Sequence, residues 1–156
     1  MMSHATKWSL RVAAALGLSG SAAFSCFAQD ASFEAGRSRW DAAALTSYEY
    51  GYQKYCDCHP EAPPETVVTV RDGEVVGVRH RPVNYTEEVP AEERNLQFYW
   101  TVDGLFDLVE SAFRRGAQVR VDYHDTLGYP TQIYIDYDLD FIGDELDLRL
   151  TGVAAL

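Results

Sequence analysis

The chain has 156 residues, with 24 acidic and 13 basic side chains and a formal net charge of −11 at pH 7. This length suits one domain with a modest core. Because an acidic surface repels phosphate and anionic lipid headgroups, the composition argues against a nucleic-acid-binding protein and favours cationic, neutral or metal-ion partners. The simpler interpretation is that the charge keeps the protein soluble.

Residues 1–28 have the pattern of an export signal. Lys7 and Arg11 provide a basic start, residues 12–18 are apolar, and residues 20–28 are mostly small. This order of segments is that of a signal peptide, which is absent from the mature protein. We therefore predict export to the periplasm or to the outside of the cell.

The sequence favours one processing site and leaves two alternatives. Cleavage is predicted after Ala28, where Cys26-Phe27-Ala28 fits an A-x-A-like site. One alternative is a lipoprotein anchored through Cys26, although Ala23 stands where a branched aliphatic residue is expected. The other is an uncleaved anchor, but the apolar run is shorter than the about 20 residues of a membrane span. We expect no membrane span.

Behind the signal we predict a flexible tail over residues 29–38 and a single α+β domain over residues 39–156. Two segments of this domain are predicted to be loops. Residues 59–65 hold three prolines among acids, and residues 81–95 hold prolines and acids with few apolar anchors. Loops of that length are either functional or mobile, and we expect the longer one to be mobile.

Tyrosines mark the first predicted strand. Tyr48, Tyr50 and Tyr52 alternate with Glu49 and Gly51, which is the period-two pattern of a half-buried strand. Because tyrosine suits a pleated, half-buried surface, we assign these rings to packing on a sheet rather than to a carbohydrate platform.

A hairpin is predicted next, because Asp72-Gly73 separates two valine-rich segments. Glycine supplies the positive φ that a two-residue turn requires. The predicted cross-strand pairs are Arg71 with Glu74, Val70 with Val75, and Thr69 with Val76. Both faces of the hairpin then carry apolar residues, which predicts a position at the centre of the sheet or cover on both sides.

One amphipathic helix is predicted between Thr101 and Gly116. Thr101 is a favourable N-cap, Asp103 suits the positive end of the helix dipole, and Gly116 is a stop signal. Apolar residues recur between them at i, i+3, i+4, i+7 and i+8, namely Leu105, Leu108, Val109, Ala112 and Phe113. This continuous apolar face predicts a helix that lies across a sheet.

Three further strands are predicted over residues 119–123, 132–137 and 146–150, each with period-two alternation. Short turns between consecutive strands imply antiparallel pairing. The predicted fold class is therefore α+β, an antiparallel β-sheet of about five or six strands with one main α-helix packed on one face.

Five sequence marks occur together in this chain. They are Cys56-Asp57-Cys58, the Asp72-Gly73 hairpin, and residues 101–106, 127–131 and 133–137. Between about Trp40 and Thr151 the chain thereby resembles domain of unknown function family 6174, an exported bacterial domain. The resemblance implies secretion and a small α+β domain, and it supplies no reaction and no catalytic residue. His124-Asp125 departs from it, because Asp-Pro is expected there.

Cys56 and Cys58 would be the only cysteines of a chain cleaved after Ala28. On a regular strand they share a face about 6.5–7 Å apart, whereas a disulfide needs Cβ atoms about 3.5–4.5 Å apart. His59-Pro60 can supply the necessary kink, and an exported compartment favours oxidation. We predict a Cys56–Cys58 disulfide. The alternatives are buried free thiols, a metal site of Cys56, Cys58 and His59, and redox exchange.

The acidic segment over residues 136–147 has the spacing of a calcium-binding loop. Its five aspartates are Asp136, Asp138, Asp140, Asp144 and Asp147. Calcium prefers such oxygen ligands, but Phe141 stands where that loop requires glycine. We therefore predict a solvated acidic turn, with weak calcium binding as the alternative.

No catalytic constellation is visible. The mature chain would keep His59, His80 and His124, and no G-x-S-x-G motif accompanies them. Ser111 is placed inside the predicted helix, and His124 and Asp125 are neighbours that would face opposite sides of a strand. We predict no catalytic residue and no cofactor.

The leading hypothesis is an exported, non-catalytic binding or structural module. We expect a monomer that engages an unknown protein or small-molecule ligand through its sheet face or acidic loops. One alternative is a thiol-based redox or metal-handling envelope protein that uses Cys56, Cys58 and His59. Another is an inhibitor-like module that binds a second secreted protein.

Overall fold

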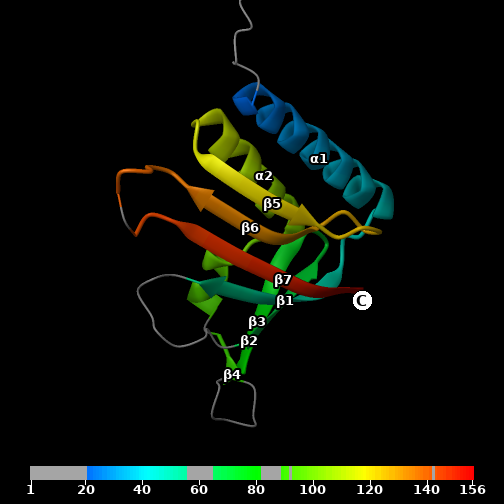
Figure 1. The fold of residues 1–156 in the computed structure, drawn as a ribbon. Helices are drawn as coiled ribbons and strands as arrows, with labels where there is room; N and C mark the ends of the chain where they lie inside the picture. The colour runs from blue at the N-terminus through cyan, green and yellow to red at the C-terminus, as the bar shows by residue number, and fades with distance from the viewer. Residues whose placement is uncertain (1–20, 56–64, 82–88, 92, 142) are drawn as a thin grey trace, which may run out of the picture.

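The computed structural model describes residues 21–55, 65–81, 89–91, 93–141 and 143–156. Within these residues it contains one antiparallel sheet of seven strands, two α-helices and one 3₁₀ helix (Figure 1). The helices are α1 (Ser21–Ala43), η1 (Glu93–Phe98) and α2 (Val102–Arg114). The strands are β1 (Tyr48–Tyr55), β2 (Glu65–Arg71), β3 (Glu74–Arg81), β4 (Val89–Pro90), β5 (Gln118–Tyr123), β6 (Pro130–Asp136) and β7 (Leu146–Ala155). The predicted α+β class is confirmed.

The strand order is β4-β3-β2-β1-β7-β6-β5. Consecutive strands pair within β1–β2–β3–β4 and within β5–β6–β7. The two groups meet where β1 pairs with β7, so the first and last strands lie side by side at the middle of the sheet. The complete sheet therefore requires contacts between the two ends of the domain.

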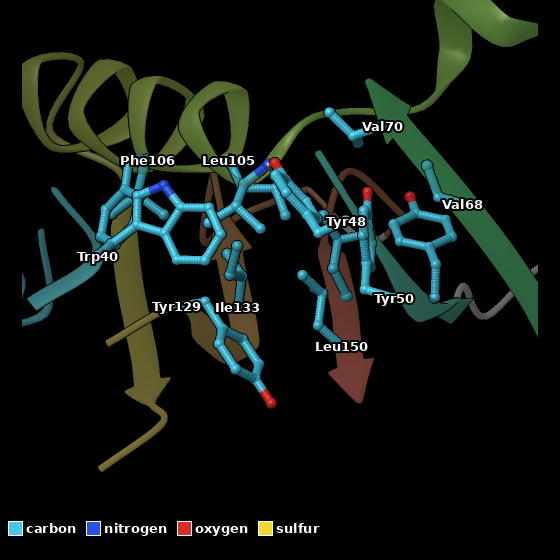
Figure 2. Packing of buried hydrophobic residues seen from close by; sticks show 14 of the residues in the cluster. Trp40, Tyr48, Tyr50, Val68, Val70, Leu105, Phe106, Tyr129, Ile133 and Leu150 are labelled. Carbon is cyan, nitrogen blue, oxygen red and sulfur yellow. Dashed lines mark hydrogen bonds between the residues drawn. The ribbon is translucent and has the colours of Figure 1, made fainter. Parts of the chain in front are cut away.

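The predicted role of the tyrosines of β1 is confirmed, because they pack in the core. Tyr48, Tyr50 and Tyr52 are each at most 5% exposed and face the same side of the sheet as α2. Figure 2 shows Trp40, Tyr48 and Tyr50 in a row between α2 and the strands. The Tyr48 hydroxyl oxygen accepts a hydrogen bond from the Val102 N–H at 2.8 Å, and the Tyr50 hydroxyl donates to the Trp100 carbonyl. These bonds compensate the burial of two polar groups.

Helix α2 forms as its sequence predicts. The Thr101 side-chain oxygen accepts a hydrogen bond from the Gly104 N–H at 3.0 Å and caps the first turn. The helix ends at Arg114, two residues before Gly116. The buried side chains on its core face are Val102, Leu105, Phe106, Val109 and Ala112. Their burial fixes α2 on one face of β5 and β6.

The structure corrects the predicted tail over residues 29–38, because α1 runs through this segment. Phe33 makes edge contacts with Phe106 and Phe113, at centroid distances of 5.7 and 6.0 Å. Trp40 is 2% exposed, and its ring centroid lies 5.2 Å from that of Tyr48. Phe33 and Trp40 are seven residues apart and share a helix face, and their burial against the core orders the segment.

Arg37 joins α1 to α2 on the same face. Its Nε lies 3.1 Å from Asp41 Oδ1 in α1, and its Nη2 lies 3.3 Å from Asp103 Oδ1 in α2. The guanidinium carbon is also 5.2 Å from the centroid of the Phe106 ring. One cation thus links the two helices beside the aromatic contacts.

The predicted hairpin forms, but its register is wrong in part. Arg71 pairs with Glu74 and Val70 with Val75, as predicted, whereas a register shift places Thr69 opposite Gly77. The extra residue is Val76, which is 47% exposed. Only the two-residue β4 lies beyond β3, so the hairpin is near one edge of the sheet rather than at its centre.

Two predicted loops are only partly described. The proline-rich loop over residues 59–65 lies outside the described residues except for Glu65, which begins β2. The predicted loop over residues 81–95 contains β4 and the start of η1 in its described part. Among the described helices, none is long and apolar enough to cross a membrane.

Candidate binding surface

The face of the sheet opposite α2 is polar, and we call it the open face. In Figure 1, β5 and β6 lie in front of α2, which packs behind them. The open face is made of the residues that alternate with the buried core residues along each strand. Its main members are Glu49, Gln53, Tyr55, Thr69, Arg79, Arg120, Asp122, Gln132, Tyr134, Asp147, Arg149 and Thr151. Aromatic, cationic and acidic groups therefore share one surface.

The register aligns these side chains in rows across four strands. One row runs from β5 to β1 through Arg120, Tyr134, Asp147 and Tyr55. The next row runs in the same direction through Asp122, Gln132, Arg149 and Gln53. Because paired strands lie about 4.8 Å apart, neighbours in a row are within reach of one another and of one ligand.

Two arginines of the open face lie on tyrosine rings. The guanidinium carbon of Arg120 is 4.4 Å from the centroid of Tyr134, and that of Arg149 is 4.5 Å from the centroid of Tyr55. Arg149 Nη2 also lies 3.8 Å from Asp147 Oδ2. A ring that carries a guanidinium is not a bare stacking platform for a sugar, so the surface offers positioned N–H donors instead.

Glu49 forms the centre of a second polar group on the open face. Arg79 donates from Nη1 to Glu49 Oε1 at 3.1 Å and from Nη2 to Glu49 Oε2 at 3.3 Å. The Thr69 hydroxyl donates to the same Oε1 at 2.7 Å. The hydrogen bonds from Arg79 and then from Thr69 lower the pKa of Glu49 below its ordinary value. This two-pronged contact holds Arg79 in one orientation.

The cysteine site predicted from the sequence lies outside the described residues. Cys56, Cys58 and His59 follow directly after Tyr55, the last residue of β1. The predicted disulfide and its metal and redox alternatives therefore stay predictions.

The acidic segment after β6 does not assemble a metal site in the part of it that is described. No group of three or more His, Cys, Asp or Glu side chains that could hold a metal ion occurs among the described residues. Asp138 and Asp140 are exposed, as predicted for a solvated turn. Asp136 differs from that prediction, because it is only 8% exposed and its Oδ1 has no hydrogen-bond partner in the described part of the chain.

His124 has a structural role in the turn between β5 and β6. Its Nδ1 accepts hydrogen bonds from the N–H groups of Thr126 and Leu127, at 3.2 and 3.1 Å. Its ring stacks on that of Tyr129 with centroids 4.8 Å apart. Asp125 is exposed and forms no ion pair in the described part of the chain. This geometry supports an ordinary turn rather than an acid–base pair.

His80 lies at the far end of β3, on the core side of the sheet. Its Nδ1 is 3.1 Å from the Thr66 hydroxyl, and its Nε2 is 3.4 Å from the Tyr99 hydroxyl. The Tyr99 ring packs against Tyr52, with centroids 5.6 Å apart. These contacts connect η1 to β1 and β3, and no carboxylate of the described residues contacts the histidine.

The open-face residues were not singled out from the sequence. The sequence pattern from which they could have been found was present, because each of them alternates with apolar core residues along its strand. The partners Arg120 and Tyr134 are 14 residues apart in sequence, and Arg149 and Tyr55 are on strands from opposite ends of the domain. Only the strand order and register show that these pairs meet.

Comparison with known proteins places most of the chain in a family. The model of a family of unknown function, DUF6174, matches residues 32–155. No curated protein and no solved structure matches the chain. The matched segment begins at Ser32, so it includes the part of α1 that carries Phe33 and Trp40.

Proposed function

The chain belongs to DUF6174, a family of unknown function, and we propose that it is an exported, non-catalytic binding module whose partner contacts the open face. The observation that carries this proposal is the pair of arginine–tyrosine contacts, Arg120 on Tyr134 and Arg149 on Tyr55. Arginine and tyrosine are the side chains most enriched at the energetic centres of protein interfaces.

The surroundings of these pairs favour a protein partner over a small molecule. Small-molecule sites are concave and mostly apolar, whereas the open face is a broad sheet surface with polar rows. Two shallow hollows of the described part lie largely away from this face, although Arg79 also lines one of them. One, of about 250 Å³, lies between α1 and α2, and the other, of about 510 Å³, lies beside β3. The open face therefore suits a partner that covers several strands.

Charge also supports a binding role for the open face. The chain as a whole is strongly acidic. On this face three arginines, Arg79, Arg120 and Arg149, balance three acids, Glu49, Asp122 and Asp147. Arg120 and Arg149 are exposed. The tyrosine rings beneath them restrict the orientations of the two guanidinium groups. A partner carboxylate can use their outward N–H groups with a smaller loss of side-chain entropy.

Photo-crosslinking from the open face tests this proposal. A crosslinker at Thr151 would be used to measure capture of a partner in cells that export the protein. The variant R120A/R149A is expected to reduce the captured amount at least about tenfold, because hot-spot truncation commonly costs more than 1 kcal/mol. The matched variant R114A/R115A removes the same charge at the C-terminal end of α2 and should leave capture unchanged. Equal capture by both variants would refute the open face as the binding surface.

Export is proposed from residues 1–28 and has its own measurement. The intact mass of the protein recovered after export, with and without reductant and thiol alkylation, reports cleavage, lipidation and the state of both cysteines. A mass that starts at Gln29, with thiols protected until reduction, would support a disulfide-stapled binding module. A retained metal ion or freely alkylated thiols would favour the redox or metal-handling alternative at Cys56, Cys58 and His59.

A further inference from the structure

The turn that joins β6 to β7 exposes large apolar side chains. We call residues 137–141 the turn tip. Leu139 is 73% exposed, Phe141 is 63% exposed and Tyr137 is 38% exposed. These are three of the six large apolar side chains that are exposed in the described part of the chain. Such a concentration on one short segment is typical of an interaction site.

The backbone of the turn tip is held by local hydrogen bonds. The Phe141 N–H donates to the Asp138 carbonyl at 2.9 Å, and the Asp140 N–H donates to Asp138 Oδ1 at 3.1 Å. The flanking Gly143 N–H donates to Glu145 Oε2 at 2.8 Å. The apolar side chains thus project from an ordered turn, which reduces the entropy that a partner must remove on binding.

Carboxylates alternate with the apolar side chains and follow them. Asp138 and Asp140 are exposed, Asp144 and Glu145 are half-buried, and none of the four forms an ion pair within the described residues. Their charge attracts lysine and arginine and opposes insertion into an anionic bilayer. The combination favours a protein surface over a lipid surface.

We propose that the turn tip is an anchor that inserts Leu139 and Phe141 into an apolar pocket of a partner protein, and that lysine or arginine side chains at the rim of this pocket pair with Asp138 and Asp140. The anchor lies outside the rows of the open face and does not depend on the function proposed for that face. Two large apolar side chains at the centre and charges at the rim form the usual arrangement of a protein interface.

A defined probe tests the chemistry of this anchor. The probe is a synthetic helical peptide of leucine and lysine, which presents an apolar stripe bordered by ammonium groups. Titration of the full exported chain, followed by backbone amide NMR, is expected to shift the signals of residues 138–141 most. The variant L139S/F141S should bind at least about tenfold more weakly, as expected when anchors are truncated. The control F98S removes an equally exposed ring from η1 and should bind as the wild type does.

The charges of the turn tip have a matched test of their own. The variant D138N/D140N should weaken binding of the peptide and flatten its dependence on salt, because two attractive charges are lost. The control E74Q/D125N removes two exposed charges elsewhere and should retain the affinity of the wild type. The open-face variant R120A/R149A should also retain it, so failure of one proposal is distinguishable from failure of the other.

Three results would overturn the anchor. They are unchanged affinity of L139S/F141S, signal shifts concentrated outside residues 138–141, and binding of phosphatidylglycerol vesicles that depends on Leu139 and Phe141. The last result would assign the turn tip to a membrane. Because both side chains are exposed, the serine variants should keep the fold, and the amide spectrum of each variant checks this directly.

Discussion

At the scale of single residues, two glycines with similar backbone angles have different constraints. Gly128 has φ of +78°, and a Cβ there would lie 2.2 Å from the Gly36 carbonyl oxygen. Gly73 has φ of +80°, and a Cβ there would meet nothing within 4 Å. Conformation alone explains glycine at the hairpin turn, whereas close packing of α1 against the β5–β6 turn adds a second requirement at Gly128.

The two glycines therefore predict different losses of stability. Gly73→Ala should lower the free energy of unfolding by about 1 kcal/mol, the typical cost of positive φ for a residue with a Cβ. Gly128→Ala should cost at least about 2 kcal/mol more, because backbone of α1 must move. Urea unfolding of both variants measures the difference. Equal losses would mean that α1 can move away from the new Cβ without a loss of stability.

Glu49 predicts a stability change on acidification. Its contacts with Arg79 and Thr69 lower its pKa in the folded state, so the folded state binds the proton more weakly than the unfolded state. The stabilising contribution is present above the ordinary value of 4.5 and is lost as pH falls through the lowered pKa. Glu49→Gln should therefore reduce stability near neutral pH, and its difference from wild type should shrink in acid. Urea unfolding across this pH range tests it, with the exposed Glu74→Gln as control. A constant difference would contradict the assignment.

At the scale of elements, α1 shows how tertiary contacts decide whether a segment is ordered. The sequence of residues 29–38 has few large apolar residues, and on that ground it predicts a tail. Phe33, Arg37 and Trp40 nevertheless share one helix face, and that face meets α2 and β1. The i, i+4, i+7 spacing of these residues is the signal from which the helix could have been predicted.

Shortening the chain at two points tests the contribution of α1. A chain that begins at residue 31 keeps Phe33, Arg37 and Trp40 and should unfold with the same free energy as a chain that begins at Gln29. A chain that begins at residue 45 loses all three contacts. It should be destabilised by at least about 3 kcal/mol, since removal of one buried tryptophan ring alone typically costs that much. Both free energies are measured by urea unfolding. An unchanged free energy of unfolding for the chain that begins at residue 45 would show that α1 does not stabilise the domain.

The β2–β3 hairpin shows the limit of register prediction from a turn. Asp72-Gly73 correctly fixed the first two pairs, Arg71 with Glu74 and Val70 with Val75. The register shift between Val70 and Thr69 has one local marker, Gly77, because a glycine inside a strand is typical of a bulge. It lets Val68 pair with Val78 so that both are buried, and it leaves Val76 exposed. Burial of valines on the core face therefore set the register beyond the turn.

At the scale of the whole molecule, the core contains several buried phenol groups. Burial raises the pKa of Tyr48 to about 12. Burial also raises the pKa values of Tyr50, Tyr52 and Tyr123 above the ordinary value of 10.0. The folded state thus holds these protons more tightly than the unfolded state.

The protein is therefore expected to unfold in alkali in a single transition that also ionises its buried tyrosines. Their contribution to stability is complete below pH 10.0 and falls as the pH rises from there toward their raised pKa values. Tyrosinate absorbance and circular dichroism should change together with pH. Ionisation of every tyrosine while the dichroism stays native would contradict the prediction.

The sequence by itself determined the α+β class, the tyrosine strand, the start of the hairpin and the bounds of α2, because alternation, turn residues and caps act over a few neighbouring residues. Only the tertiary structure decided that β1 pairs with β7 and that α1 forms a helix packed on the core. It also decided that Arg120 contacts Tyr134 and that Arg149 contacts Tyr55. These contacts join residues that are distant in sequence, and their positions follow from burial of one common core. The surface proposed for binding follows from that arrangement, because the core covers one face of the sheet and the polar rows lie on the other.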